Sequence, residues 1–201
     1  MTGIEKICFI IWKLIQLTLI FHLLSLAGLF VLGIGPAWQT IATLFLETSQ
    51  DEKHYSLKRA FQIWKTCFKE ANSLFYLFLL VSFLLGLNLH LALQMHSLIW
   101  FTLSFVIMVA MACNWMVYIY MIFYTISYEI KLWENAKLAF ISVFLSFKQF
   151  LETLGVLILL SYITWQYKGL FIFISFGLLV FLLNLVTKPN RELVDGMIDE
   201  A

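Results

Sequence analysis

Four long runs without any charged side chain constrain this chain most. No Asp, Glu, Lys or Arg occurs in residues 14–46, 71–128, 153–167 or 169–187. A helix rises about 1.5 Å per residue and the hydrocarbon core of a bilayer is about 30 Å thick, so one crossing takes about 20 residues. Lipid offers an open backbone no hydrogen-bond partners, and the runs lack the alternation of a membrane β-barrel. The runs therefore predict an all-α integral membrane protein.

We expect about five transmembrane helices in a single domain that fills residues 1–201. Only 12% of the residues are charged, whereas a soluble domain carries about 25%. The longest run is long enough for two crossings joined by a turn in its one polar patch, residues 88–97. The expected spans are residues 14–46, 72–90, 97–127, 150–167 and 169–187.

Basic residues indicate which loops face the cytoplasm. Ten of the thirteen Lys and Arg residues fall in segments 47–70, 129–148 and 188–201, and cytoplasmic loops are enriched in these residues. Five crossings then place the N-terminus outside and the C-terminus in the cytoplasm, in a multi-pass protein of the plasma membrane. Lys6 and Lys13 would lie on the unfavoured side. An alternative folds residues 7–46 as a re-entrant segment or double pass, with the N-terminus inside.

A glycine–proline segment, Gly33–Pro36, breaks the first apolar run. Pro36 suits the first position of a new helix, with Gly35 as its N-cap. Such an internal helix start carries free amides and holds anionic groups in some transporters, whereas a simple kink needs no ligand. Both interpretations stay open. Two polar side chains within the spans, His22 and Asn114, join Gly35 and Pro36 as candidate ligand-binding residues, or only bond neighbouring helices.

The chain carries an internal similarity at an offset of 79 residues. The offset pairs identical residues at Lys58/Lys137, Ala60/Ala139, Phe61/Phe140, Phe68/Phe147 and Lys69/Lys148. It predicts a parallel two-helix repeat followed by a fifth helix. Repeats of this kind are common in transporters, but they also arise when a packing unit is duplicated.

Two cytoplasmic amphipathic segments are predicted, at residues 55–69 and 131–148. Each has apolar residues spaced by three and four beside basic residues, which suits the anionic inner leaflet or a partner protein. The candidate membrane-interface or partner-binding residues are Phe61, Trp64, Phe68, Lys69, Phe140 and Phe147. The acidic tail at 190–201 is expected to be solvated and poorly ordered.

The sequence contains no motif of a known catalytic or cofactor site. We find no nucleophile elbow, phosphate-binding loop, dinucleotide fingerprint or zinc-protease motif. The three cysteines, Cys8, Cys67 and Cys113, lie far apart and suit neither a disulfide framework nor a zinc site. With a net charge of +1, nucleic acid is not an expected partner. We expect no catalytic residues, no cofactor and no metal, and the lipid bilayer as the main partner.

The segment Leu32-Gly33-Ile34-Gly35-Pro36-Ala37, which follows an apolar first helix, resembles the YesL-like membrane family of unknown function. The family is also similar in its length of about 200 residues, its five predicted spans and its basic-aromatic segment, here Phe61 to Lys69. The resemblance implies a bacterial plasma-membrane protein with a non-enzymatic accessory role in carbohydrate uptake, beside the permease subunits of an ABC-type importer. It assigns no site residues. The alternative, based on the repeat and the broken helix, is an independent small-solute transporter.

Overall fold

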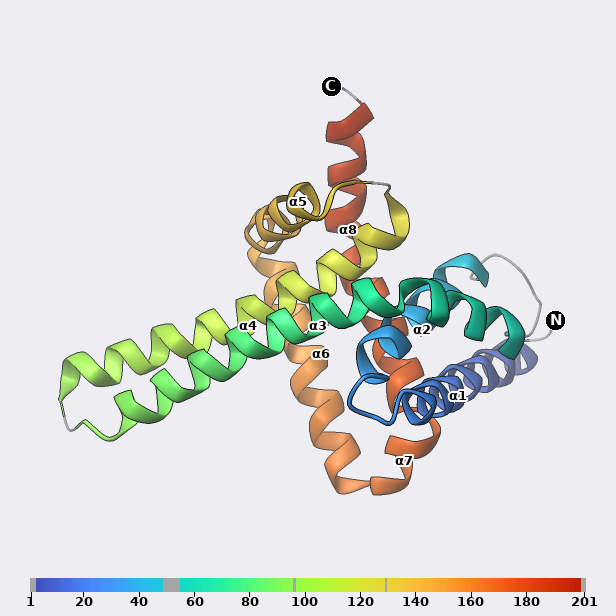
Figure 1. The fold of residues 1–201 in the computed structure, drawn as a ribbon, viewed down its shortest axis with the longest axis horizontal. Coiled ribbons are helices and arrows are strands. Elements are labelled where there is room, and N and C mark those ends of the chain that lie inside the picture. Colours follow the sequence, from blue (N-terminus) through green and yellow to red (C-terminus); the bar gives the residue numbers. More distant parts are fainter. Residues whose placement is uncertain (1–2, 49–54, 96, 129, 200–201) are drawn as a thin grey trace. The chain divides into compact units, whose positions relative to one another are not determined.

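The computed structural model describes residues 3–48, 55–95, 97–128 and 130–199, and their regular structure is entirely helical (Figure 1). The helices are α1 (Gly3–Ala27), α2 (Ile34–Thr48), α3 (Leu57–Leu93), α4 (Leu98–Ser127), α5 (Leu132–Leu145), α6 (Phe147–Gln166), α7 (Lys168–Phe173) and α8 (Ser175–Asp199). Four of them are long and apolar enough to cross a membrane: residues 7–27 of α1, and all of α3, α4 and α6. The predicted all-α membrane fold is confirmed.

The fifth predicted span, residues 169–187, does not form one membrane-crossing helix. The chain breaks at Ile174, between the short α7 and the longer α8. The charge-free part of α8 covers only residues 175–187, about 20 Å of helix against a hydrocarbon core of about 30 Å. The predicted acidic tail also differs, because α8 continues as helix through Pro189 to Asp199. Residues 200 and 201 of that tail lie outside the described residues.

The first predicted span, residues 14–46, is two helices rather than one broken helix. A six-residue turn at residues 28–33 joins α1 to α2, and the two helices pack along each other. The break therefore begins five residues before the predicted Gly33–Pro36 segment. Pro36 is the third residue of α2, where its missing amide proton leaves no intrahelical bond unmade.

The two predicted amphipathic segments differ in structure. Residues 57–69 are not a separate helix but the first turns of α3, which runs on without interruption as the second span. No glycine or proline lies between Leu57 and Val81 to end it. The second segment forms the separate helix α5, which ends at Leu145. Phe147 consequently belongs to α6. Residues 49–54, in the first basic segment, lie outside the described residues.

The chain divides into two compact units, where the sequence predicted a single domain. Unit 1 comprises residues 1–72 and 151–201, and unit 2 comprises residues 73–150. This division does not follow the 79-residue repeat, which would pair residues 14–46 with 93–125. The repeat therefore stays a prediction.

Unit 1 is built around a close crossing of α1 and α8. The backbone N–H of Gly177 donates to the Thr18 hydroxyl at 2.9 Å, and that hydroxyl donates to the Leu14 carbonyl at 3.0 Å. Beside this crossing the rings of Phe21 and Phe176 stack with centroids 3.9 Å apart. A Cβ atom on Gly177 would lie 2.2 Å from the Leu14 carbonyl oxygen. Only glycine allows this approach.

Unit 2 contains a long hairpin of the second part of α3 with α4, followed by α5. Within it, the Tyr124 hydroxyl lies 2.7 Å from that of Ser142, which joins α4 to α5. Asn135 of α5 donates to the Met121 carbonyl at 3.1 Å and to the Thr125 hydroxyl at 2.7 Å. Side-chain hydrogen bonds thus fasten α5 to the last turns of α4.

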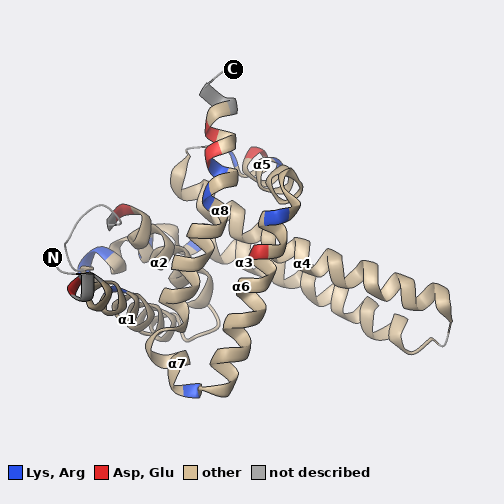
Figure 2. Cartoon of the chain, turned by 180° about the vertical axis from the view of Figure 1, so that it is seen from behind, with Lys and Arg blue, Asp and Glu red and all other residues tan. Residues whose placement is uncertain are grey.

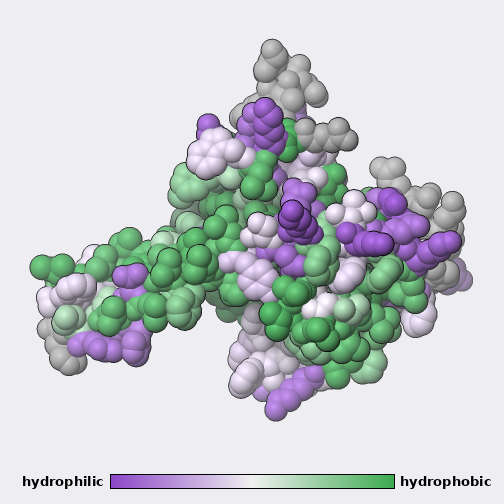
Figure 3. All heavy atoms as spheres, in the orientation of Figure 1, coloured by the Kyte–Doolittle hydropathy of each residue, from purple (hydrophilic) through white to green (hydrophobic). Residues whose placement is uncertain are grey.

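The outer surface of the hairpin is apolar. Figure 2 shows no charged residue along it, and in Figure 3 its flanks are hydrophobic while hydrophilic residues gather at its closed end. Phe83 and Phe105 are 62% and 63% exposed. Large apolar side chains facing outward on both helices indicate that lipid or another membrane helix covers these flanks.

We expect Gly177→Ala to destabilise unit 1 by about 1–3 kcal/mol, because the added methyl group must push α8 away from α1. Gly155→Ala is the matched control, since a Cβ atom at this helical glycine meets nothing within 4 Å and Ala favours a helix. Thermal unfolding of the purified variants in mild detergent measures both. Equal melting temperatures for the two variants would contradict the close crossing.

Candidate functional site

The four candidate ligand-binding residues do not form one site. Gly35, Pro36 and His22 belong to unit 1, and Asn114 belongs to unit 2. Each must therefore be considered in its own surroundings.

The turn between α1 and α2 is a tight, internally bonded structure. Leu29 and Phe30 have positive φ angles of 56° and 59°, which are costly for residues other than glycine. A Cβ atom on Gly33 would lie 2.3 Å from the Ser25 carbonyl oxygen. The N–H of Phe30 donates to that same carbonyl at 2.8 Å, and the side-chain amide of Asn72 donates to the Leu32 carbonyl at 2.9 Å. The break is therefore a reversal of the chain direction that depends on glycine.

Pro36 faces α3 within unit 1. Its carbonyl oxygen accepts a hydrogen bond from the Thr40 hydroxyl at 2.7 Å, and the Cys67 thiol lies 3.9 Å from the same oxygen. These contacts give the glycine–proline segment a packing role between α2 and α3. Ligand binding at Gly35 and Pro36 stays a prediction.

His22 connects α1 to α7. Its Nε2 atom lies 3.0 Å from the Phe171 carbonyl oxygen and, when protonated, donates to it. Its ring also lies 5.4 Å from the Phe171 ring and 5.3 Å from the Phe176 ring, centroid to centroid. This aromatic environment accounts for a histidine in a membrane segment without a ligand, so its ligand role also stays a prediction.

Asn114 connects the two helices of the hairpin in unit 2. Its amide nitrogen donates to the Phe78 carbonyl at 3.1 Å and to the Ser82 hydroxyl at 2.9 Å. Hydrogen bonds of this kind join membrane helices. Asn114 therefore has a structural function between these two helices, and ligand binding by Asn114 stays a prediction.

The basic-aromatic residues form a partly exposed row along the first turns of α3, in which Trp64 and Phe68 are half-buried. The rings of Phe61 and Trp64 stack at 5.6 Å, and Trp64 meets Phe68 edge-on at 4.7 Å. Lys69 and half of Phe61 are exposed. The indole N–H of Trp64 has no hydrogen-bond partner among the described residues. In unit 2, Phe140 and Phe147 are also exposed. Their interface role stays a prediction.

Both ends of the α1–α2 hairpin lie close to the start of α3. The Lys13 ammonium lies 5.6 Å from the centre of the Tyr55 ring, and burial raises the pKa of Tyr55 to about 12, which keeps it neutral. Arg59 and Glu47 form an ion pair at 2.8 Å. Lys13 of α1 and Glu47 of α2 therefore both lie near the start of α3 within unit 1, as the double-pass alternative expects.

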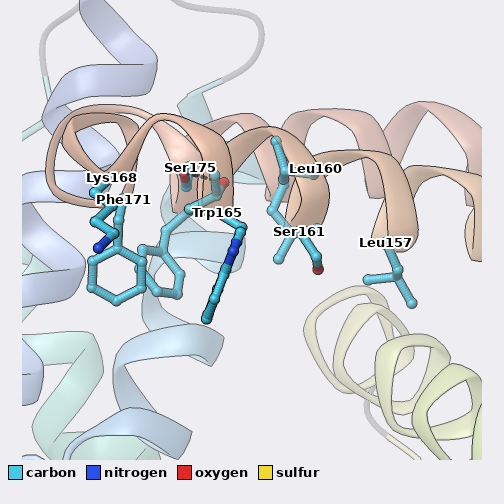
Figure 4. Close-up of a pocket in the computed structure, with 10 residues that line it drawn as sticks. Leu157, Leu160, Ser161, Trp165, Lys168, Phe171 and Ser175 are labelled. Atoms are coloured by element: carbon cyan, nitrogen blue, oxygen red, sulfur yellow. Dashed lines mark hydrogen bonds between the residues drawn. The ribbon is translucent and has the colours of Figure 1, made fainter.

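A cavity in unit 1 is the main site that sequence reasoning missed. It has a volume of about 500 Å³ and lies where α6, α7 and α8 meet (Figure 4). The lining residues are Leu157, Leu160, Ser161, Thr164, Trp165, Lys168, Phe171, Ser175, Phe176 and Leu179. Their contributions come from three helices, so no single stretch of sequence reveals the cavity.

The charged side chain of this cavity, which we call the corner cavity, lies at one end. Figure 4 shows Lys168 and Phe171 together at one end and Leu157 at the other. The hydroxyls of Thr164 and Ser175 lie 2.8 Å apart and bond each other, so the wall between the two ends has little free polarity. The corner cavity can hold an apolar group beside one cation.

No group of three or more His, Cys, Asp or Glu side chains that could hold a metal ion comes together in the ranges that the structure covers. The corner cavity contains no carboxylate, thiol or imidazole. Its lysine and hydroxyl groups are the chemistry that it offers a ligand.

Part of the chain matches the model of a known protein family. Residues 14–89 match the model of DUF624, described as a protein of unknown function. The match covers α2, the turn before it and most of α1 and α3. No curated protein and no solved structure matches the chain.

We expect Asn114→Leu to destabilise the hairpin by about 0.6–1.7 kcal/mol, since two interhelical hydrogen bonds are lost. Asn88→Leu is the matched control, because Asn88 only donates to the Leu84 carbonyl in its own helix. Thermal unfolding of both variants in detergent provides the measurement. A larger loss of stability for Asn88→Leu would contradict the role assigned to Asn114.

Proposed function

We propose that this chain is a non-enzymatic accessory component of a carbohydrate uptake system of the ABC type, in a bacterial plasma membrane. The observation that carries this proposal is that polar side chains inside the helical units form hydrogen bonds between helices. Asn114, Asn135 and Thr18 all bond to neighbouring helices. A protein whose embedded polar groups serve packing suits a structural partner better than a solute pathway.

The resemblance to the YesL-like family supports the carbohydrate link. The match to DUF624 over residues 14–89 is consistent with that resemblance, since it covers the turn, Pro36 and the basic-aromatic row. The accessory role itself comes from the resemblance, and permease subunits are the partners that it implies.

Sidedness follows from the α1–α2 hairpin and the basic residues. If α2 returns to the side on which α1 begins, Lys6 and Lys13 lie with residues 47–70 in the cytoplasm. If α7 and α8 together return the chain to that side, although neither helix alone is a candidate span, Lys168 is the one basic residue outside, against twelve inside. This arrangement satisfies the positive-inside rule better than five spans with an outer N-terminus. We infer that both termini are cytoplasmic.

Two single-cysteine proteins test this topology, in a background where Cys8, Cys67 and Cys113 are alanine. We expect Lys168→Cys to react with a membrane-impermeant maleimide in intact spheroplasts. Glu5→Cys, just before the apolar part of α1, should react only after the membrane is opened. Labelling of Glu5→Cys in intact spheroplasts would place the N-terminus outside and restore the single first span.

Docking to the permease is assigned to the exposed aromatic residues of the cytoplasmic segments. Phe61 and Phe140 are 50% and 56% exposed. Exposed aromatic groups of this kind are typical anchors of protein interfaces. These aromatic side chains could also lie among lipid headgroups, so the experiment must distinguish binding to a permease from contact with lipid.

Affinity purification of the tagged protein from its host in mild detergent, followed by mass spectrometry, tests the accessory role. We expect permease subunits of a carbohydrate importer in the eluate, and an about fivefold lower recovery with the double variant Phe61→Ala/Phe140→Ala. Phe83→Ala, which removes an equally exposed ring from the apolar part of α3, is the control. A wild-type eluate without permease subunits would refute the proposal.

The second candidate is an independent small-solute transporter, and the corner cavity is the observation in its favour. Its mostly apolar wall suits sugar hydroxyls poorly, because each buried hydroxyl needs a hydrogen-bond partner. Uptake of labelled sugars by vesicles that contain only this protein would favour the transporter.

A further inference from the structure

We propose that the corner cavity binds one anionic phospholipid, with an acyl chain between α6 and α8 and the headgroup phosphate at Lys168. This site does not depend on the proposed accessory function. It follows from the size, the lining and the membrane depth of the cavity.

The size and lining suit an acyl chain. A volume of about 500 Å³ lies within the range of about 300–1,000 Å³ that small-molecule pockets span. Leu157 lies at the end away from Lys168 (Figure 4), and Leu160 and Leu179 also line the cavity. The hydroxyls of Thr164 and Ser175 bond each other at 2.8 Å, and so they do not compete for a polar ligand. The cavity wall is therefore compatible with hydrocarbon.

The charge at the other end selects the headgroup. Lys168 is exposed, and no ion pair or hydrogen bond of its ammonium occurs within the part of the chain that the structure describes. No acidic side chain lines the cavity. A phosphate with a net negative charge complements this lone cation, whereas a zwitterionic headgroup cancels much of the attraction.

Aromatic residues place the Lys168 end at the membrane surface. Tyr162, Trp165 and Tyr167 are 62%, 78% and 67% exposed, and exposed Trp and Tyr side chains concentrate at the headgroup level of membranes. Leu157 precedes Lys168 by eleven residues, about 16 Å if α6 continued through them. The charged end then lies at headgroup depth and the leucine end at acyl-chain depth, which is how a phospholipid is oriented.

Native mass spectrometry of the full-length protein, released from nanodiscs of equimolar phosphatidylglycerol and phosphatidylcholine, tests the site. We expect the wild-type protein to retain one phosphatidylglycerol in preference to phosphatidylcholine. Lys168→Gln should lower this preference about fivefold, and Lys168→Arg should preserve it. Lys188→Gln is the matched control, because Lys188 is an exposed lysine of α8 that pairs with Glu192 and does not line the cavity.

A second variant tests the acyl-chain part independently of charge. Ser161→Trp fills the cavity from an exposed position, so the buried core of unit 1 is left intact. It should reduce retention of both lipids, whereas Lys168→Gln should affect only the choice between them. The proposal is overturned if wild-type protein retains both lipids equally, if Lys168→Gln matches Lys188→Gln, or if Ser161→Trp retains lipid as wild type does.

Discussion

The structure depends on the lack of hydrogen-bond partners in hydrocarbon. A polar group that enters the bilayer is stabilised by a partner within the protein, and several side chains of the described helices find one by similar means. Threonine and serine hydroxyls bond the carbonyl four residues earlier, as Thr18 and Thr40 do. Asparagine amides reach across to a neighbouring helix, as Asn114 and Asn135 do, or to the turn between two helices, as Asn72 does. These bonds decide which helices become neighbours.

Glycine provides the second condition for packing, because lipid gives helices no hydrophobic reason to associate. Gly33 allows the turn to approach α1, and Gly177 allows α8 to lie against the backbone of α1. At both places a methyl group would overlap a carbonyl oxygen. Small residues and polar bonds therefore hold unit 1 together, and large apolar side chains are left to face outward.

The sequence predicted the class of the protein well, because charge-free runs report directly on membrane thickness. It located α4 and α6 to within a few residues, since these runs end at polar patches or charges. It misplaced the first break because Gly28 carries no proline signal, although Gly28 and Gly33 frame the turn. The prediction also split α3 into two segments after its last lysine, Lys69. A helix continues from a polar into an apolar stretch where no glycine or proline interrupts it. The corner cavity could not be predicted from the sequence, because the periodicity of one helix does not show how three helices pack together.

The turn between α1 and α2 has a consequence for how this protein enters the bilayer. Its residues, 28–33, are Gly-Leu-Phe-Val-Leu-Gly, and they carry no group that needs water. The hairpin can thus be inserted from the cytoplasm without moving any charge or polar loop through the hydrocarbon. Its tip need not emerge on the far side at all, because α2 is about 22 Å long, less than the thickness of the apolar layer. In the topology proposed above, burial of the apolar residues 14–46 would then drive insertion without any charged side chain crossing the bilayer.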